Sequence, residues 1–180
     1  MTGRRLVLAA GALALAVLLG GLLLPAAAII PVQGATPADW NARSFWFRPW
    51  GKSGVHRGID IFAKEGTPVI AATSGVVVYA GGLRDGGNVV AILGPCWRVH
   101  YYAHLRASSV AGGQFVRQGA PIGTVGSTGN AVGKPPHLHY ALITQLPYVW
   151  RYRPERFGLD RIWYLKPEFR AQSGRLRAGD

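Results

Sequence analysis

A long apolar run dominates the first thirty residues of the chain. It covers residues 6–24 without a polar break and follows two arginines, Arg4 and Arg5. A positive start before an apolar segment is typical of an export signal. A helix packed on a soluble core would normally carry a polar face, and this run has none. We therefore expect residues 1–30 to form an apolar helix that acts as a signal anchor or a signal peptide.

The length of the run bears on the choice between anchor and signal peptide. It exceeds the ~7–15 apolar residues of a cleaved signal core and approaches the ~20 residues needed to span a bilayer. We favour a retained anchor that contacts the membrane through residues 6–30. Three alanines at 26–28 would suit a signal peptidase, so cleavage stays the alternative. The folded part is then extracytoplasmic: anchored in the inner membrane and facing the periplasm or cell wall, or secreted after cleavage.

Beyond residue 30 the pattern changes to short β-branched runs separated by glycine-rich turns. Residues 31–44 are small, polar and proline-containing, which predicts a linker before a domain at 45–146. The runs in that domain lack the length and period of helices, so they indicate strands. The predicted strands cover residues 67–72, 75–80, 88–93, 98–103, 121–125 and 137–143.

The composition supports a β-rich fold. The 180 residues include 25 Gly and 12 Pro, which favour many turns and few long helices. A chain of this length holds one compact domain with little left over. We therefore predict an all-β fold, a small antiparallel β-sheet domain preceded by the N-terminal apolar helix. Cys96 is the single cysteine and can form no internal disulfide, so it does not indicate the redox compartment.

The C-terminal extension, residues 147–180, is basic and aromatic. Arginines interleaved with aromatic side chains could bind a glycan or a nucleic acid through stacking and charge. Such side chains also bury well against a β-sheet. We expect the extension to wrap the domain, and we assign it no chemistry.

The net charge of the chain is +12, from 20 Lys and Arg against 8 Asp and Glu. A field of this sign attracts nucleic acid, anionic lipid and anionic cell-wall polymers, with little discrimination among them. An exported chain would be in a different compartment from the chromosome, so we expect no nucleic-acid partner.

The first candidate chemical group is the pair His56 and Asp60, four residues apart. A neutral imidazole nitrogen and a carboxylate oxygen are both good zinc ligands. Gly58, which lies between them, disfavours a helix, so the pair is expected to lie where a loop enters a strand.

The second candidate group is His137 and His139, within a predicted strand. Residues two apart in a strand point to the same face, so the two imidazoles should lie side by side. The preceding prolines, Pro135 and Pro136, hold the start of the strand extended and would position the rings.

The third candidate is His104, at the end of a predicted strand where a side chain can reach a cleft. Regular alternation would place His100, Tyr102 and His104 on one face, unless a bulge near the strand end separates them. We treat His100 as structural. Each histidine motif alone is weak evidence for a metal site. Together the motifs supply three His and Asp ligands and two further histidines, which is the set of groups that a hydrolytic zinc site requires.

These motifs, in this order, resemble the lysostaphin-like or LytM-type zinc endopeptidases of family M23. The similarity runs from about residue 45 to residue 143. Residues 94–100 and 134–136 depart from the usual family pattern and leave the shape of the groove open. The motifs that carry the resemblance are His56-Arg57-Gly58-Ile59-Asp60-Ile61, Gly66-Thr67-Pro68-Val69, Ala71-Ala72-Thr73-Ser74-Gly75-Val76-Val77, Tyr102-Ala103-His104-Leu105, Gly123-Thr124-Val125-Gly126-Ser127-Thr128-Gly129 and His137-Leu138-His139-Tyr140.

The resemblance implies a small antiparallel β fold, of the duplicated-hybrid-motif type, whose groove holds one Zn²⁺. The metal ligands would be His56, Asp60 and His139, with water in the fourth position. His104 and His137 would be catalytic: one as the general base or the group that orients the nucleophile, the other stabilising the oxyanion. Such enzymes cleave peptide cross-links of bacterial peptidoglycan.

We therefore expect a monomeric zinc metalloendopeptidase whose substrate is a peptidoglycan peptide. The alternative is a non-catalytic scaffold of the same fold that binds the cell wall or activates a separate amidase. The presence of all five proposed site residues favours the enzyme.

Overall fold

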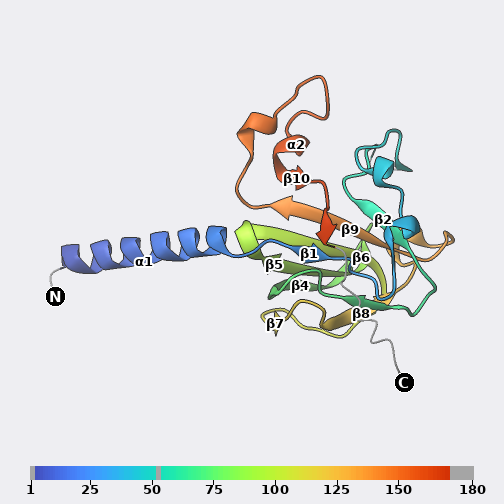
Figure 1. Cartoon of the computed structure of the whole chain (residues 1–180), viewed down its shortest axis with the longest axis horizontal. Helices are drawn as coiled ribbons and strands as arrows, with labels where there is room; N and C mark the ends of the chain where they lie inside the picture. The colour runs from blue at the N-terminus through green and yellow to red at the C-terminus, as the bar shows by residue number, and fades with distance from the viewer. Residues whose placement is uncertain (1–2, 52–53, 171–180) are drawn as a thin grey trace, which may run out of the picture.

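The computed structural model describes residues 3–51 and 54–170, and most of them belong to a β-sheet domain (Figure 1). The helices are α1 Gly3–Leu23, η1 Pro37–Asp39, η2 Ala42–Ser44, η4 Pro95–Trp97, η5 Gly129–Ala131, η6 Val149–Arg151 and α2 Asp160–Trp163. The strands are β1 Ala28–Ile29, β2 Ile59–Phe62, β3 Pro68–Ile70, β4 Gly75–Leu83, β5 Gly87–Gly94, β6 Arg98–Ser108, β7 Phe115–Val116, β8 Pro121–Val125, β9 His137–Thr144, β10 Tyr164–Leu165 and β11 Phe169–Arg170.

The main sheet has the strand order β10-β9-β6-β5-β4-β7, with β2 paired to β9 and β8 joining β6 to β3. Each of its pairings is antiparallel. The predicted antiparallel β fold with an apolar N-terminal helix is therefore confirmed. Each predicted strand is present, although β3 is shorter than expected and β6 continues five residues beyond residue 103.

Strand alternation builds the core under the sheet. In β9, Leu138 and Tyr140 are fully buried on the core side, and Tyr102 of β6 packs edge-on against Tyr140 with ring centroids 5.3 Å apart. The hydroxyl of Tyr102 accepts a hydrogen bond of 2.8 Å from the backbone N–H of Ala72. This bond ties the segment after β3 to the centre of the sheet.

Replacing Tyr102 by phenylalanine is expected to lower the free energy of unfolding by about 1–3 kcal/mol. The substitution removes the acceptor and leaves the buried N–H of Ala72 unpaired. Urea unfolding of the full chain in detergent micelles measures the loss. Tyr79→Phe is the matched control, because the hydroxyl of Tyr79 bonds the exposed Gly82 carbonyl, where water can replace it. Equal stability of Tyr102→Phe and the wild type would contradict the prediction.

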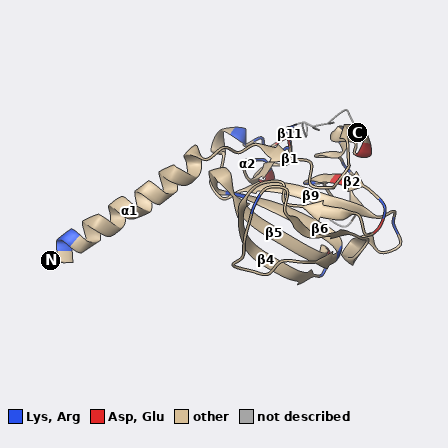
Figure 2. Cartoon of the chain, turned by 60° about the horizontal axis from the view of Figure 1, so that its bottom comes forward, with Lys and Arg blue, Asp and Glu red and all other residues tan. Residues whose placement is uncertain are grey.

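The apolar helix α1 extends away from the domain, and none of its residues is buried (Figure 1). Its charged residues lie only at its start, and the rest of its length is uncharged (Figure 2). Its C-terminal half contacts the unusual segment around η4, where the indole N–H of Trp97 donates to the Leu18 carbonyl at 2.9 Å. By length and composition α1 could cross a membrane.

The segment after α1 is bound to the domain. β1 pairs in parallel with β11, and the side chains of Ile30 and Val32 are buried in the core. Val32 also forms a bridge with Val69. The start of the stretch that the sequence indicates as a linker, residues 31–44, is therefore packed rather than extended through solvent.

The described part of the C-terminal extension covers one end of the sheet. β10 adds a short antiparallel strand to β9, with Tyr164 opposite Ile143 and Leu165 opposite Leu142. Ile162 and Leu165 are buried. This part of the extension therefore wraps the domain. Residues 171–180 lie outside the described residues.

Candidate metal centre and its flanking histidines

The pairing of β2 with β9 brings together side chains that lie far apart in the sequence. Asp60 is opposite His139, and Phe62 is opposite His137. The neighbouring residues of both strands, including Ile61 and Leu138, are buried in the core. Strand alternation therefore gives Asp60, His137 and His139 the opposite face.

Three potential ligand atoms converge at this face. Asp60 Oδ1 lies 3.1 Å from His56 Nε2 and 2.8 Å from His139 Nδ1, and the two histidine nitrogens are 3.1 Å apart. One ligand atom from each of the three residues falls within 4.8 Å of the others. The structure thus brings together the three residues that the resemblance implies as zinc ligands.

The hydrogen bonding of His56 shows that this cluster suits a cation. Its Nδ1 lies 3.0 Å from the Ser44 carbonyl, which can only accept, so Nδ1 carries the proton. In the neutral ring Nε2 then presents a lone pair to the Asp60 carboxylate. Two lone pairs at 3.1 Å repel each other unless a positive charge lies between them. Imidazole nitrogen and carboxylate oxygen are also the donors that zinc accepts, so the residues fit a metal ion.

Local packing holds the His56 ring. The indole of Trp50 stacks on it with ring centroids 4.1 Å apart and planes inclined by 19°. Gly58 is needed for a close approach: a Cβ at this position would lie 2.6 Å from the Tyr140 carbonyl oxygen and 2.8 Å from Cε1 of His139. A larger residue would therefore displace the backbone of the loop or the ring of His139.

Asp60 is held as a carboxylate. Burial alone would raise its pKa, but the hydrogen bonds with His139 and His56 outweigh burial and hold the pKa well below its usual range. An ionised carboxylate is the form that binds a metal ion.

His104 reaches the same face because of a β-bulge in β6. Asn88 of β5 pairs with Leu105, whereas Val90 pairs with Tyr102, so β6 has one extra residue at this point. His104 adopts a φ of 63°, in the left-handed region. Tyr102 and Leu105 both remain in the core, and His104 lies beside His137, with ring centroids 5.1 Å apart.

The rings of His104 and His137 are oriented by backbone carbonyls. His104 Nδ1 donates to Thr128 at 2.9 Å, and His137 Nδ1 donates to Pro135 at 2.8 Å. In each neutral ring the lone pair is therefore on Nε2, and that of His137 lies 3.9 Å from Asp60 Oδ2. Burial, together with the neighbouring His139 and His137, lowers the pKa of His104 to about 4, so its ring is neutral at pH 7 and can accept a proton.

His100 lies on the other face of β6. It is buried, and its Nδ1 is 2.5 Å from the hydroxyl of the core residue Tyr140. Burial, followed by the charge of Arg98, lowers its pKa to about 4. Its contacts are those of a structural histidine, as expected from the sequence.

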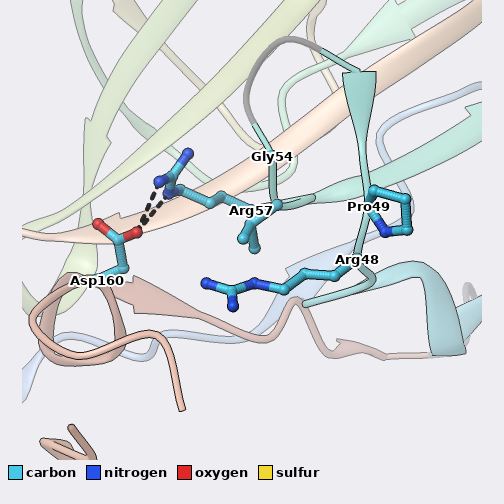
Figure 3. A pocket seen from close by; sticks show the side chains of 6 residues that line it. Arg48, Pro49, Gly54, Arg57 and Asp160 are labelled. Atoms are coloured by element: carbon cyan, nitrogen blue, oxygen red, sulfur yellow. Dashed lines mark hydrogen bonds and ion pairs between the residues drawn. The ribbon is translucent and has the colours of Figure 1, made fainter. Parts of the chain in front are cut away.

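A pocket of about 490 Å³ lies beside the His56 loop, and the sequence did not reveal it (Figure 3). Arg57 spans part of it, with Nε and Nη2 at 2.9 and 2.7 Å from Asp160 Oδ2. Arg48 faces the same space and places its guanidinium 4.5 Å from the ring centre of Phe157. Asp160 and Phe157 come from the C-terminal extension. The extension therefore contributes side chains next to the candidate centre, and only the basic and aromatic composition of the tail hinted at this.

Comparison with known proteins gives a family match over the same region. Residues 54–149, more than half of the chain, match the model of peptidase family M23. Over 113 residues the chain is 42% identical to the L-Ala--D-Glu endopeptidase of Bacillus subtilis, which covers 58% of this chain and 35% of that protein. It is 38% identical over 114 residues to the peptidoglycan DD-endopeptidase ShyC of Vibrio cholerae, covering 60% of this chain and 26% of that protein. The chain thus spans about a third or less of the length of these relatives.

Solved structures agree with the fold. The catalytic domain of lysostaphin from Staphylococcus simulans superposes with a TM-score of 0.50 and 37% identity, over 53% of this chain and 73% of that one. A zinc-containing peptidase from Vibrio cholerae gives a TM-score of 0.53 and 27% identity, over 64% of this chain and 36% of that one. The sheet described above is therefore of the lysostaphin-like type.

Proposed function

The chain belongs to peptidase family M23, and on that basis we propose that it is a zinc-dependent endopeptidase that hydrolyses the peptide cross-links of bacterial peptidoglycan. The observation that carries the proposal is the convergence of His56 Nε2, Asp60 Oδ1 and His139 Nδ1, with His104 and His137 beside them. The relatives named as a peptidoglycan DD-endopeptidase and an L-Ala--D-Glu endopeptidase support the substrate class.

His56, Asp60 and His139 would hold the zinc ion. Bound zinc lowers the pKa of a coordinated water toward ~7 and polarises a carbonyl group. The Ser44 carbonyl keeps the proton of His56 on Nδ1, so that Nε2 is available as a ligand. Such outer hydrogen bonds fix the tautomer and orientation of a metal-binding histidine.

His104 and His137 would transfer protons and stabilise negative charge during peptide hydrolysis. Their Nδ1 protons are held by the Thr128 and Pro135 carbonyls, which leaves each Nε2 to exchange a proton with the reacting groups. A histidine that has taken up a proton can in turn stabilise the oxyanion of the tetrahedral intermediate. The two rings lie 5.1 Å apart at their centroids, close enough to act on one scissile bond.

Residues 3–23 would deliver the domain to the cell wall. α1 is long and apolar enough to cross a membrane, with arginines at its start. In this proposal α1 anchors the domain at the outer face of the inner membrane, or serves as a signal that is cleaved after export.

The test is zinc content and peptidoglycan digestion of the full chain, purified in a mild detergent. We expect one zinc per chain and release of soluble peptides that mass spectrometry identifies as cleaved cross-links. Chelation should abolish the release, and added zinc should restore it. If the chain binds no zinc, or binds zinc and cuts nothing, the proposal fails, and the scaffold that binds the wall or activates an amidase takes its place.

A further inference from the structure

A second pocket, of about 530 Å³, lies where the chain leaves α1 and meets the C-terminal extension. Residues 26–28 form one side of it, and β6, β9 and β10 contribute others. None of the five residues of the candidate catalytic centre lines it. Its side chains therefore require an explanation apart from peptide hydrolysis.

The lining of this pocket is strongly basic. It includes Arg98, Arg151, Lys166 and Arg170, against a single acidic residue, Glu168. Within residues 3–51 and 54–170, none of these four cations has a carboxylate within 4.0 Å. In the part of the chain that the structure describes, their positive charges have no neutralising partner.

Two of the arginines donate few hydrogen bonds from their guanidinium groups to the described residues. Arg98 donates from Nη2 to the Tyr148 hydroxyl at 3.1 Å, yet its buried Nε has no hydrogen-bond partner among the described residues. Arg151 donates from Nη1 to the Tyr164 carbonyl at 3.3 Å, a long bond. Each guanidinium carries five N–H donors, and those that bond no protein atom are available to a bound anion. The pKa of Arg151 is lowered by burial and by the nearby charge of Arg161, which agrees with an uncompensated positive potential.

The position of the pocket indicates where its anion comes from. α1 ends at Leu23, just before the lining residues 26–28. Its 21 residues measure about 31 Å, which matches the ~30 Å hydrocarbon core. The arginines at its start favour the cytoplasmic side for that end. The pocket then lies at the level of the lipid headgroups on the opposite side.

The neighbouring surface also suits the membrane interface. The rings of Tyr148 and Trp150 stack with centroids 4.9 Å apart, and Trp150 is 68% exposed. Tyrosine and tryptophan are enriched where hydrocarbon meets headgroups. Arg151 and Leu165 of the extension line the same pocket as residues 26–28, so the extension lies beside the segment that follows α1.

We propose that this pocket binds the phosphate headgroup of an anionic phospholipid. The phosphodiester oxygens would accept hydrogen bonds from the guanidinium groups of Arg98 and Arg151, and Lys166 would add a point charge. Binding docks the domain against the membrane surface through the extension, and it does not depend on the peptidase activity.

The proposal is tested by calorimetric titration of the full chain in uncharged detergent. Three ligands are compared: dihexanoyl phosphatidylglycerol, dihexanoyl phosphatidylcholine and inorganic phosphate. We expect phosphatidylglycerol to bind at least about tenfold more tightly than the other two. The basic lining repels the choline cation of phosphatidylcholine, and inorganic phosphate lacks the acyl chains that hold a lipid in the detergent surface beside the pocket. Equal affinity for phosphatidylcholine would show acyl-chain binding, and equal affinity for phosphate would show a free-anion site; either result overturns the assignment to an anionic lipid.

Variants locate the binding. Arg151→Gln and Lys166→Gln should each weaken phosphatidylglycerol binding about tenfold or more. Arg117→Gln removes the same charge outside the pocket and should stay within about twofold of the wild type. Thermal unfolding and zinc content, measured on every variant, report whether each is folded. Unchanged affinity of the two folded pocket variants would overturn the proposal.

Discussion

Replacing His139 by alanine is expected to abolish zinc binding and peptidoglycan cleavage together. His139 Nδ1 is one corner of the triangle with His56 Nε2 and Asp60 Oδ1. Its loss leaves two protein ligands. The zinc affinity should fall by more than the ~10–100-fold that removal of an outer-shell partner costs.

The matched control for this variant is His137→Ala. His137 lies two residues away on the same face of β9, but only His139 belongs to the three-residue cluster. Metal analysis after dialysis should find one zinc in His137→Ala and none in His139→Ala, with both inactive on peptidoglycan. Zinc retained by His139→Ala at the wild-type level would remove His139 from the ligand set.

Replacing His104 should separate metal binding from catalysis. We expect His104→Ala to keep its zinc while the rate of cross-link cleavage falls by about 10²–10⁴-fold, the usual contribution of a general acid or base. His104 lies near His139 without belonging to the metal cluster, with ring centroids 5.9 Å apart. Cleavage rates on purified sacculi, measured beside zinc content, give both quantities.

The left-handed backbone at His104 calls for a second variant. Alanine is strained at a φ of 63°, whereas asparagine tolerates this region. His104→Asn should therefore fold as well as the wild type and show the same loss of cleavage. Wild-type cleavage by His104→Asn would exclude a proton-transfer role, and loss of zinc in both variants would instead make His104 a ligand.

The sequence predicted much of this site because strand alternation is a local rule. It places His137 and His139 on one face, and the structure has them there. The same rule placed His104 with Tyr102, and only the bulge brings His104 to the other face. A bulge depends on the register of neighbouring strands. The residues around His104 therefore allowed a bulge but could not predict one.

The groups that orient the histidines could not be predicted from the sequence. The acceptors for His56 and His104 are the backbone carbonyls of Ser44 and Thr128, and any residue supplies a carbonyl. The ion pair of Arg57 with Asp160 joins residues 103 apart, and no local periodicity links them. The pairing of β1 with β11 is equally remote, and composition therefore indicated a linker at residues 31–44, where Val32 is buried.

The attachment of β1 to β11 limits how far the sheet domain can lie from α1. Only residues 24–27 separate α1 from the sheet, a stretch that spans at most about 14 Å when extended. A long flexible tether would let the domain reach wall material at many distances from the membrane. With α1 held in a bilayer, the domain instead stays at a nearly fixed distance from the membrane. As the proposed peptidase it would therefore act on the wall material nearest the membrane.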